Sequence, residues 1–214
     1  MFTGLVKEIG VIESKLKKGG KTFFNISCKS VQKGLTIGES ISCNGICLTV
    51  VNCTNDMILV ETMNQTIEKT TAKNWNINTS VHLENALCFL DKLNGHLVQG
   101  HIDCVTKLSN IYIVKNTHYL VFSIPNQYSD LVIEHGSICI DGVSLTIAKL
   151  SFGYFEVALI EHTIKSTHFN KLKIGALVNI EFDIIGKYVK GIMKNTRNSE
   201  QDVNLEWAKD NGYA

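Results

Sequence analysis

One stretch of this sequence occurs twice, and the duplication constrains the fold more than any other feature. Residues 40–51 read SISCNGICLTVV and residues 137–148 read SICIDGVSLTIA, an offset of 97. The copies share Ser, Ile, Gly, Leu and Thr at equivalent places. One difference changes the chemistry, because Cys47 lies opposite Ser144. A thiol in one copy and a hydroxyl in the other predict two related pockets that are no longer equivalent.

Further blocks repeat in the same order at an offset of 96 or 97. They align residues 2–6 with 98–102, 23–27 with 119–123, 63–67 with 160–164, and 81–84 with 178–181. Self-similarity at a fixed offset is the signature of a duplicated structural unit. We therefore expect two modules, at residues 1–96 and 97–184, followed by a C-terminal segment at 185–214.

Within a module, short β-branched or apolar runs alternate with turn residues. In the first copy the runs cover residues 23–28, 41–51, 57–61 and 81–84. Asn44-Gly45 and Asp141-Gly142 favour positive φ, as in tight hairpin turns. Short strands at regular spacing are typical of antiparallel barrels or sandwiches, and a closed barrel has no exposed edge. The sequence predicts an all-β fold of two similar units.

The pattern changes after the second module. Apolar residues recur at helical spacing, at Ile185, Tyr188, Val189, Ile192 and Met193. This spacing predicts an amphipathic helix of about three turns. Its apolar stripe either covers one end of a barrel or pairs with sister helices in an oligomer. The polar tail at 195–214 is expected to be partly disordered or weakly docked.

Composition argues against several classes of function. The net charge is +1, so no large charged field points to a nucleic acid or a membrane as partner. The seven Cys include no CxxC pair, which gives no signal for a metal site. The sequence has no signal-peptide core and no apolar run of about 18 residues. We expect a cytoplasmic protein with free thiols.

Five motifs together identify a resemblance. They are MFTGLV at the start, NGICLTV, NGHLVQGHID (94–103), DGVSLTI and NIEFD (179–183). In this order and spacing they resemble the riboflavin synthase alpha chain family, from residue 1 to about residue 193. The resemblance implies two six-stranded Greek-key barrels and a C-terminal helix that assembles a homotrimer. It leaves docking onto a lumazine synthase shell open.

The family's reaction gives the repeat a physical meaning. Two molecules of 6,7-dimethyl-8-ribityllumazine become riboflavin and 5-amino-6-ribitylamino-pyrimidinedione by transfer of a four-carbon unit, without a cofactor. Holding two identical ligands face to face removes a large entropic barrier, and a duplicated pocket suits that task. In the family, the active site lies between the N-terminal barrel of one subunit and the C-terminal barrel of its neighbour. Donor and acceptor need different surroundings, and aligned positions do differ: Cys47 and Ser144, Leu5 and His101, Gln65 and His162, Ala86 and Asp183.

The resemblance implies five catalytic residues: Cys47, His101, Ser144, Thr146 and Asp183. An imidazole titrates near neutrality and suits removal of the acidic C7 methyl proton of a lumazine. Ser144 and Thr146 alternate along a strand and so share one face. Structural alternatives stay open, with Cys47 as a small buried hydrophobe, Ser144 as a turn residue and Asp183 as a solvated strand-end charge.

The resemblance also implies a set of residues that contact substrate through hydroxyls, backbone groups and apolar walls, as a flat heterocycle with a polyol tail requires. This set is Gly4, Leu5, Val6, Leu48, Thr49, Glu61, Thr62, Met63, Asn64, Gln65, Thr66, Gly100, Ile102, His135, Leu145, Ala158, Leu159, Ile160, Glu161, His162 and Thr163. Two members depart from the family pattern. His135 stands where many members have Lys, and Glu161 where Pro is usual.

The mechanistic hypothesis assigns one lumazine to each barrel. The molecule near Cys47 and Thr49 is attacked at C7 by a side chain or by water. The molecule near Ser144 and Thr146 loses a methyl proton with help from His101. Which barrel holds the donor stays open.

Two other classes of protein contain a similar barrel. A non-catalytic antenna protein that binds lumazine or flavin, as in luminous bacteria, shares the fold but departs from the synthase at catalytic-type positions, which this sequence keeps. The flavin-binding barrel of a reductase needs a nicotinamide-binding domain, and no GxGxxG follows a strand here.

Overall fold

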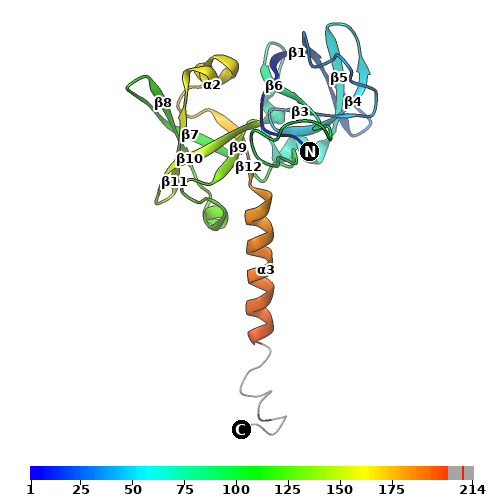
Figure 1. Cartoon of the computed structure of the whole chain (residues 1–214). Coiled ribbons are helices and arrows are strands. Elements are labelled where there is room, and N and C mark those ends of the chain that lie inside the picture. The colour runs from blue at the N-terminus through cyan, green and yellow to red at the C-terminus, as the bar shows by residue number, and fades with distance from the viewer. Residues whose placement is uncertain (202–208, 210–214) are drawn as a thin grey trace.

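The computed structural model describes residues 1–201 and residue 209. In this part of the chain, twelve strands form two closed antiparallel barrels, and one long helix projects away from them (Figure 1). Each barrel encloses its own cluster of buried apolar side chains. The all-β fold of two similar six-stranded barrels is confirmed.

The two barrels have the same strand order. The first contains β1 (Glu8–Lys18), β2 (Lys21–Ser27), β3 (Ser40–Cys43), β4 (Ile46–Cys53), β5 (Met57–Met63) and β6 (Ser80–Asn85), arranged β1-β2-β5-β4-β3-β6. The second contains β7 (Cys104–Val114), β8 (Thr117–Ser123), β9 (Ser137–Ile140), β10 (Val143–Ser151), β11 (Tyr154–Leu159) and β12 (Leu177–Phe182), in the equivalent order. Sequence analysis did not predict β1.

Short helical segments follow equivalent strands of the two barrels. They are α1 (Asn64–Lys69) and the 3₁₀ turn η1 (Thr71–Asn74) in the first barrel, and α2 (Glu161–Ser166) and η3 (His168–Lys171) in the second. A further 3₁₀ turn, η2 (Asn126–Leu131), follows β8. The strand patterns of the sequence did not indicate these segments.

The duplicated turns meet at the contact between the barrels. Asn44 and Gly45 have φ values of 45° and 79°, and Asp141 and Gly142 have 44° and 81°, as the residue types predicted. These turns split each duplicated stretch into two strands. A Cβ added to Gly45 would lie 2.7 Å from the backbone N of Gly142. Only glycine fits this approach, so the most strongly repeated motif also joins the two copies.

The leading residues of each module lie against the opposite barrel. Phe2 and Val98 pair as an antiparallel bridge, with N···O distances of 2.7 and 3.1 Å. Beyond this bridge, the Ser144 N–H donates to the Gly4 carbonyl at 2.8 Å, and the Cys47 N–H donates to the Gly100 carbonyl at 2.9 Å. The boundaries at 1–96 and 97–184 stay a prediction: the six strands of each barrel lie within these ranges, but the first residues of each range contact the opposite barrel.

The helix α3 (Ile184–Gln201) is longer than the three turns predicted from spacing, because it continues through 18 residues into the expected tail. Residues 202–208 and 210–214 of that tail lie outside the described residues. The helix does not cover a barrel end: it projects away from both barrels (Figure 1), and Ile185, Tyr188, Val189 and Met193 are all at least half exposed. Among the described residues, no helix is long and apolar enough to span a membrane.

Candidate active site

The outer face of the first barrel carries a cleft of about 540 Å³. It is formed by β4, α1 and the leading residues of the second module. Its lining residues are Ile46, Cys47, Gln65, Thr66, Lys69, Thr70, Gly100, His101 and Ile102. Six of these were singled out from the sequence, so residues from both modules, far apart in the chain, meet in this cleft.

Strand alternation explains why Cys47 faces the cleft. Along β4, the side chains of Ile46, Leu48 and Val50 point into the barrel, while Cys47 and Thr49 are partly or fully exposed. The thiol is therefore on the outer surface, where a ligand can reach it. The Cys47 side chain also packs against the small apolar cluster around Phe2.

A glycine brings His101 next to Cys47. Gly100 has φ 84°, and a Cβ added there would lie 2.5 Å from the Cys47 Cβ. Any other residue would push the two segments apart. The Gly-His order thus fixes the imidazole of His101 beside the thiol-bearing strand.

A buried carboxylate holds this loop in place. The Glu181 carboxylate accepts hydrogen bonds from the backbone N–H groups of Gln99, Gly100 and His101, at 2.6, 2.9 and 3.0 Å. Burial raises the pKa of Glu181, and the backbone donors oppose that shift. Glu84 does the same in the first module, where it accepts from the Thr3 and Gly4 N–H groups at 2.7 and 3.0 Å.

The second barrel has an equivalent half-site around Ser144. A Cβ added to Gly4 would lie 2.6 Å from the Ser144 Cβ, as Gly100 approaches Cys47. Thr146 is exposed two residues further along the same strand face. Leu5 follows Gly4, so an apolar side chain takes the place that His101 has in the first half-site.

The second half-site has its own imidazole, which sequence analysis missed. His96 Nδ1 lies 2.7 Å from Ser144 Oγ. The residue is 8% exposed, and its Nε2 is buried without a hydrogen-bond partner among the described residues. Burial lowers the pKa of His96, and the nearby Asp183 carboxylate opposes that shift. His96 lies in the linker before the second repeat, so no residue of the other copy aligns with it. Only its place in the NGHLVQGHID motif could have indicated a functional role.

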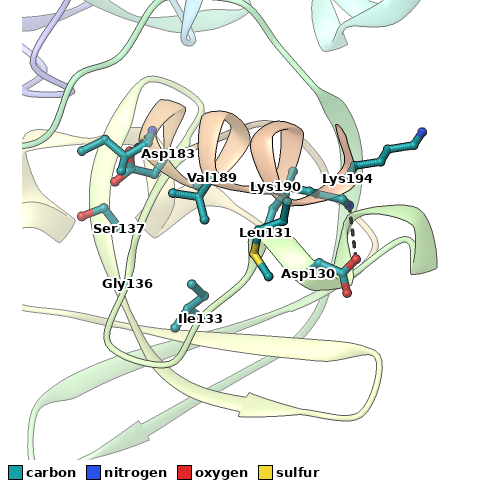
Figure 2. Close-up of a pocket in the computed structure, with 12 residues that line it drawn as sticks. Asp130, Leu131, Ile133, Gly136, Ser137, Asp183, Val189, Lys190 and Lys194 are labelled. Carbon is teal, nitrogen blue, oxygen red and sulfur yellow. Dashed lines mark hydrogen bonds and ion pairs between the residues drawn. The ribbon is translucent and has the colours of Figure 1, made fainter. Parts of the chain in front are cut away.

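Asp183 belongs to this second half-site. It immediately precedes α3, where its Oδ1 accepts the Ile185 N–H at 2.9 Å. It also lines a groove of about 940 Å³ between α3 and the second barrel, with Leu131, Ile133 and Val189 (Figure 2). The catalytic residues implied by the resemblance therefore divide, with Cys47 and His101 on one barrel and the other three on the second.

Several predicted binding residues present only their backbone to the outer face. The side chains of Leu48, Thr62 and Leu159 are at most 6% exposed and point into the barrels. Val6 and Leu145 pack partly buried against the second core. Substrate contacts by the first three residues would have to use main-chain groups.

Charged residues on the two barrels are arranged differently. Glu61, opposite Thr49 in the β4–β5 register, receives both hydrogen bonds of Lys21 Nζ at 3.0 and 3.1 Å. Glu161 forms an exposed ion pair with Lys165 at 2.5 Å. Among the described residues, no three His, Cys, Asp or Glu side chains gather as a metal site would require.

The remaining predicted contacts lie at the barrel surfaces, on strands β5 and β11 and on the loops and short helices beside them. His135 is exposed with φ 66°, and its N–H donates to the Ile147 carbonyl at 2.9 Å. His162 Nε2 lies 3.4 Å from Ser166 Oγ at the end of α2. Met63, Asn64, Ala158 and Ile160 are exposed, and Thr163 is partly buried.

The sequence of the whole chain matches known proteins. A family model described as Lumazine binding domain matches it twice, over residues 3–86 and 99–183. The chain is 34% identical to riboflavin synthase from Bacillus subtilis (strain 168), over all of both chains. The chain belongs to the riboflavin synthase family. Riboflavin synthase from Actinobacillus pleuropneumoniae is 33% identical, again over all of both chains.

Solved structures agree with the riboflavin synthase family at the level of the fold. LumP complexed with riboflavin and LumP complexed with 6,7-dimethyl-8-(1'-D-ribityl)lumazine match with TM-scores of 0.78 and 0.76, at 24% and 23% identity. Each match covers 85% of this chain and 99% of LumP. The two domain matches leave out residues 87–98, where His96 lies.

Proposed function

We propose that this protein is a riboflavin synthase, which converts two molecules of 6,7-dimethyl-8-ribityllumazine into riboflavin and 5-amino-6-ribitylamino-pyrimidinedione. The observation that carries the proposal is the cleft shared by Cys47 and His101, on a chain that also carries an equivalent half-site at Ser144. Two similar but unequal half-sites suit a reaction between two copies of one substrate. Full-length similarity to riboflavin synthases supports the same conclusion.

The geometry favours a revised division of roles. The sequence hypothesis gave His101 to the lumazine on the second barrel, but His101 lines the cleft with Cys47. We therefore assign His101 as the base for the lumazine on the first barrel. His96 and Ser144, 2.7 Å apart, form a second proton-transfer pair for the lumazine on the second barrel. Imidazoles suit this task because their protons move near neutral pH.

The remaining binding residues extend each half-site along the barrel surface. In the first barrel, Thr49, Glu61 and the residues at the start of α1 would hold the heterocycle and its polyol tail. In the second barrel, Thr146, Ala158 and the start of α2 would do so, with His135 at the edge. Polar side chains and free backbone groups are the partners that such a ligand needs.

A homotrimer is the assembly that we propose. The apolar face of α3 at Ile185, Val189 and Met193 is exposed beside the groove against the second barrel (Figure 2). A sister helix of the same chemistry would bury this face. In a trimer, the first half-site of one subunit would meet the second half-site of its neighbour, as the resemblance implies.

The decisive experiment adds 6,7-dimethyl-8-ribityllumazine to purified, dialysed protein and follows riboflavin by absorbance. Catalytic formation of one riboflavin for every two lumazines, with no cofactor added, is the expected result. Tight binding with a shifted spectrum and no turnover would instead make the protein an antenna-type binding protein. Co-sedimentation with a lumazine synthase shell would test that further association, and fractionation would test the cytoplasmic location that seven free thiols favour.

A further inference from the structure

Three residues of the cleft lining were not singled out from the sequence, and one of them, Lys69, carries a charged side chain. Lys69 is the last residue of α1 and lines the cleft with Cys47, Gln65 and His101. Its side chain is exposed and makes no hydrogen bond or ion pair with the described residues. An exposed ammonium group is charged at neutral pH. It is therefore available to a ligand in the cleft.

No acidic side chain offsets this charge within the cleft. None of the lining residues is Asp or Glu. The Glu181 carboxylate is occupied by backbone N–H groups of the 99–101 loop. Glu61 is held by Lys21, and Glu68 lines a different pocket on the other side of α1. Lys69 is thus the one side chain of the lining with a permanent charge.

The second half-site lacks this charge. The residue equivalent to Lys69 is Ser166, the last residue of α2. The lysine next to it, Lys165, is neutralised by its ion pair with Glu161 at 2.5 Å. The two half-sites therefore differ in electrostatics as well as in the exchange of Cys47 for Ser144.

We propose that Lys69 stabilises the lumazine of the first barrel as an anion, a role that rests on the proposed function. His101 takes a proton from the C7 methyl group and becomes an imidazolium. The electron pair of the broken C–H bond stays on the methyl carbon and delocalises into the heterocycle. The Lys69 ammonium, which neither gains nor loses a proton, lowers the energy of that negative charge. The first barrel then holds the carbon nucleophile, and the second barrel holds the molecule that it attacks.

The test measures formation of the anion separately from riboflavin synthesis. In D₂O, each deprotonation of the C7 methyl group allows deuterium to replace hydrogen, which NMR detects in the remaining substrate. The variants are Lys69→Ser, which copies the residue of the second repeat, and the charge-conserving Lys69→Arg. Lys73→Ser, four residues along and outside the cleft, is the matched control.

At saturating lumazine, Lys69→Ser is expected to slow exchange about 3- to 20-fold, the range for a single charge near a partly solvated anion. Lys69→Arg should restore most of the rate, and Lys73→Ser should leave it unchanged. If Lys69→Ser exchanges deuterium at the wild-type rate when lumazine is saturating, the proposal is overturned. A raised KM would not rescue it, because the lysine would then contribute only to substrate binding. A wild-type protein that forms no riboflavin would instead refute the proposed function itself.

Discussion

His82 and His168 stack on one another in the buried contact between the barrels, with ring centroids 3.8 Å apart. His82 Nε2 accepts the backbone N–H of His168 at 2.9 Å, and its Nδ1 lies 2.8 Å from the Asp141 carbonyl oxygen. This pairing requires a neutral His82 ring with the proton on Nδ1. In the other copy, the equivalent contact joins Asn179 Oδ1 to the Thr71 N–H at 2.8 Å. One copy thus uses a titratable pair where the other uses a neutral amide.

Acid should destabilise the fold once Asp141 is replaced by Asn, the residue of the other repeat. Burial lowers the pKa of His168 from 6.5 to about 4 and that of His82 well below 6.5. Between about pH 6.5 and pH 4 the unfolded chain binds protons that the folded chain does not, so stability falls as the pH is lowered through this range. For His168 alone the loss is on the order of 3 kcal/mol. Urea unfolding of Asp141→Asn between pH 7.5 and 4.5 measures it.

The wild-type protein should show a shallower pH dependence. Burial raises the pKa of Asp141 from 3.8 to about 7. On acidification the folded chain therefore takes up a proton before the unfolded chain does, which favours folding and opposes the histidines. His168 Nε2 and Asp141 Oδ2 are 3.9 Å apart, and both groups are neutral between about pH 4 and pH 7. Replacing both histidines by the residues of the other repeat, His82→Asn with His168→Thr, should make stability rise on acidification. A curve identical to wild type would contradict this account.

Gly100→Ala should cost activity as well as stability. The added Cβ would lie 2.5 Å from the Cys47 Cβ, and φ is 84°. Gly34→Ala is the matched control, since φ is 85° but nothing lies within 4 Å. The control should lose only about 1 kcal/mol from backbone strain. In addition to this loss of stability, Gly100→Ala should have a kcat/KM at least tenfold lower than that of Gly34→Ala. Equal activity in the two folded variants would show that the close contact does not matter.

His96→Gln should lower turnover about 100-fold, the usual contribution of a proton-transfer group. Ser144→Ala removes the other partner of the 2.7 Å contact. If the two act as one unit, the double variant should be little slower than either single variant. Steady-state rates of the wild type, the two single variants and the double variant, measured from pH 5 to 9, complete this double-mutant cycle. Multiplicative losses would mean that the two residues act independently.

His101→Gln should reduce turnover by at least 100-fold, because it removes the imidazole that we assign as base in the first half-site. Cys47→Ser keeps a small polar group in the same place, so a smaller loss is expected. Riboflavin formation at saturating lumazine gives both values. Wild-type turnover in both variants would refute these assignments.

Two inactive subunits should complement one another if sites are shared between neighbours. His101→Gln damages the first half-site, and Ser144→Ala damages the second. Refolding a mixture of the two variants should recover roughly a quarter to a third of the wild-type rate, since a minority of the sites would then combine two intact halves. Val189→Asp, on the exposed face of α3, should reduce both the sedimentation coefficient and the activity. Failure to recover any activity from stable mixed oligomers would count against shared sites.

The repeat made much of this fold predictable. Strand alternation, the positive-φ turns at Asn44 and Asp141 and the amphipathic helix are local features, so residue type and spacing report them directly. Their duplication then fixed the number of barrels. Cys47 and His101 could also be identified as functional candidates from the sequence, because both lie in recognisable motifs.

The features that escaped prediction depend on contacts that no single repeat contains. His96 lies in the linker, where comparison of the two copies gives no information. The placement of His101 with Cys47 follows from an approach of backbones at Gly100, which spacing along the chain does not encode. The buried pair of His82 and His168 likewise forms only when the two barrels meet.

Because the first residues of each module lie against the opposite barrel, cutting the chain between the modules separates each half-site into two pieces. A fragment of residues 1–96 keeps Cys47 but loses Gly100 and His101, so it carries an unfinished surface. If two such fragments paired as the two modules do in the whole chain, Gly4 of each fragment would take the place of Gly100 against the other fragment's Cys47. Leu5 would then stand where the whole chain has His101. A symmetric pair of single modules therefore has the architecture without the imidazole beside the thiol. Fusion of two modules into one chain is what allows the two halves to diverge.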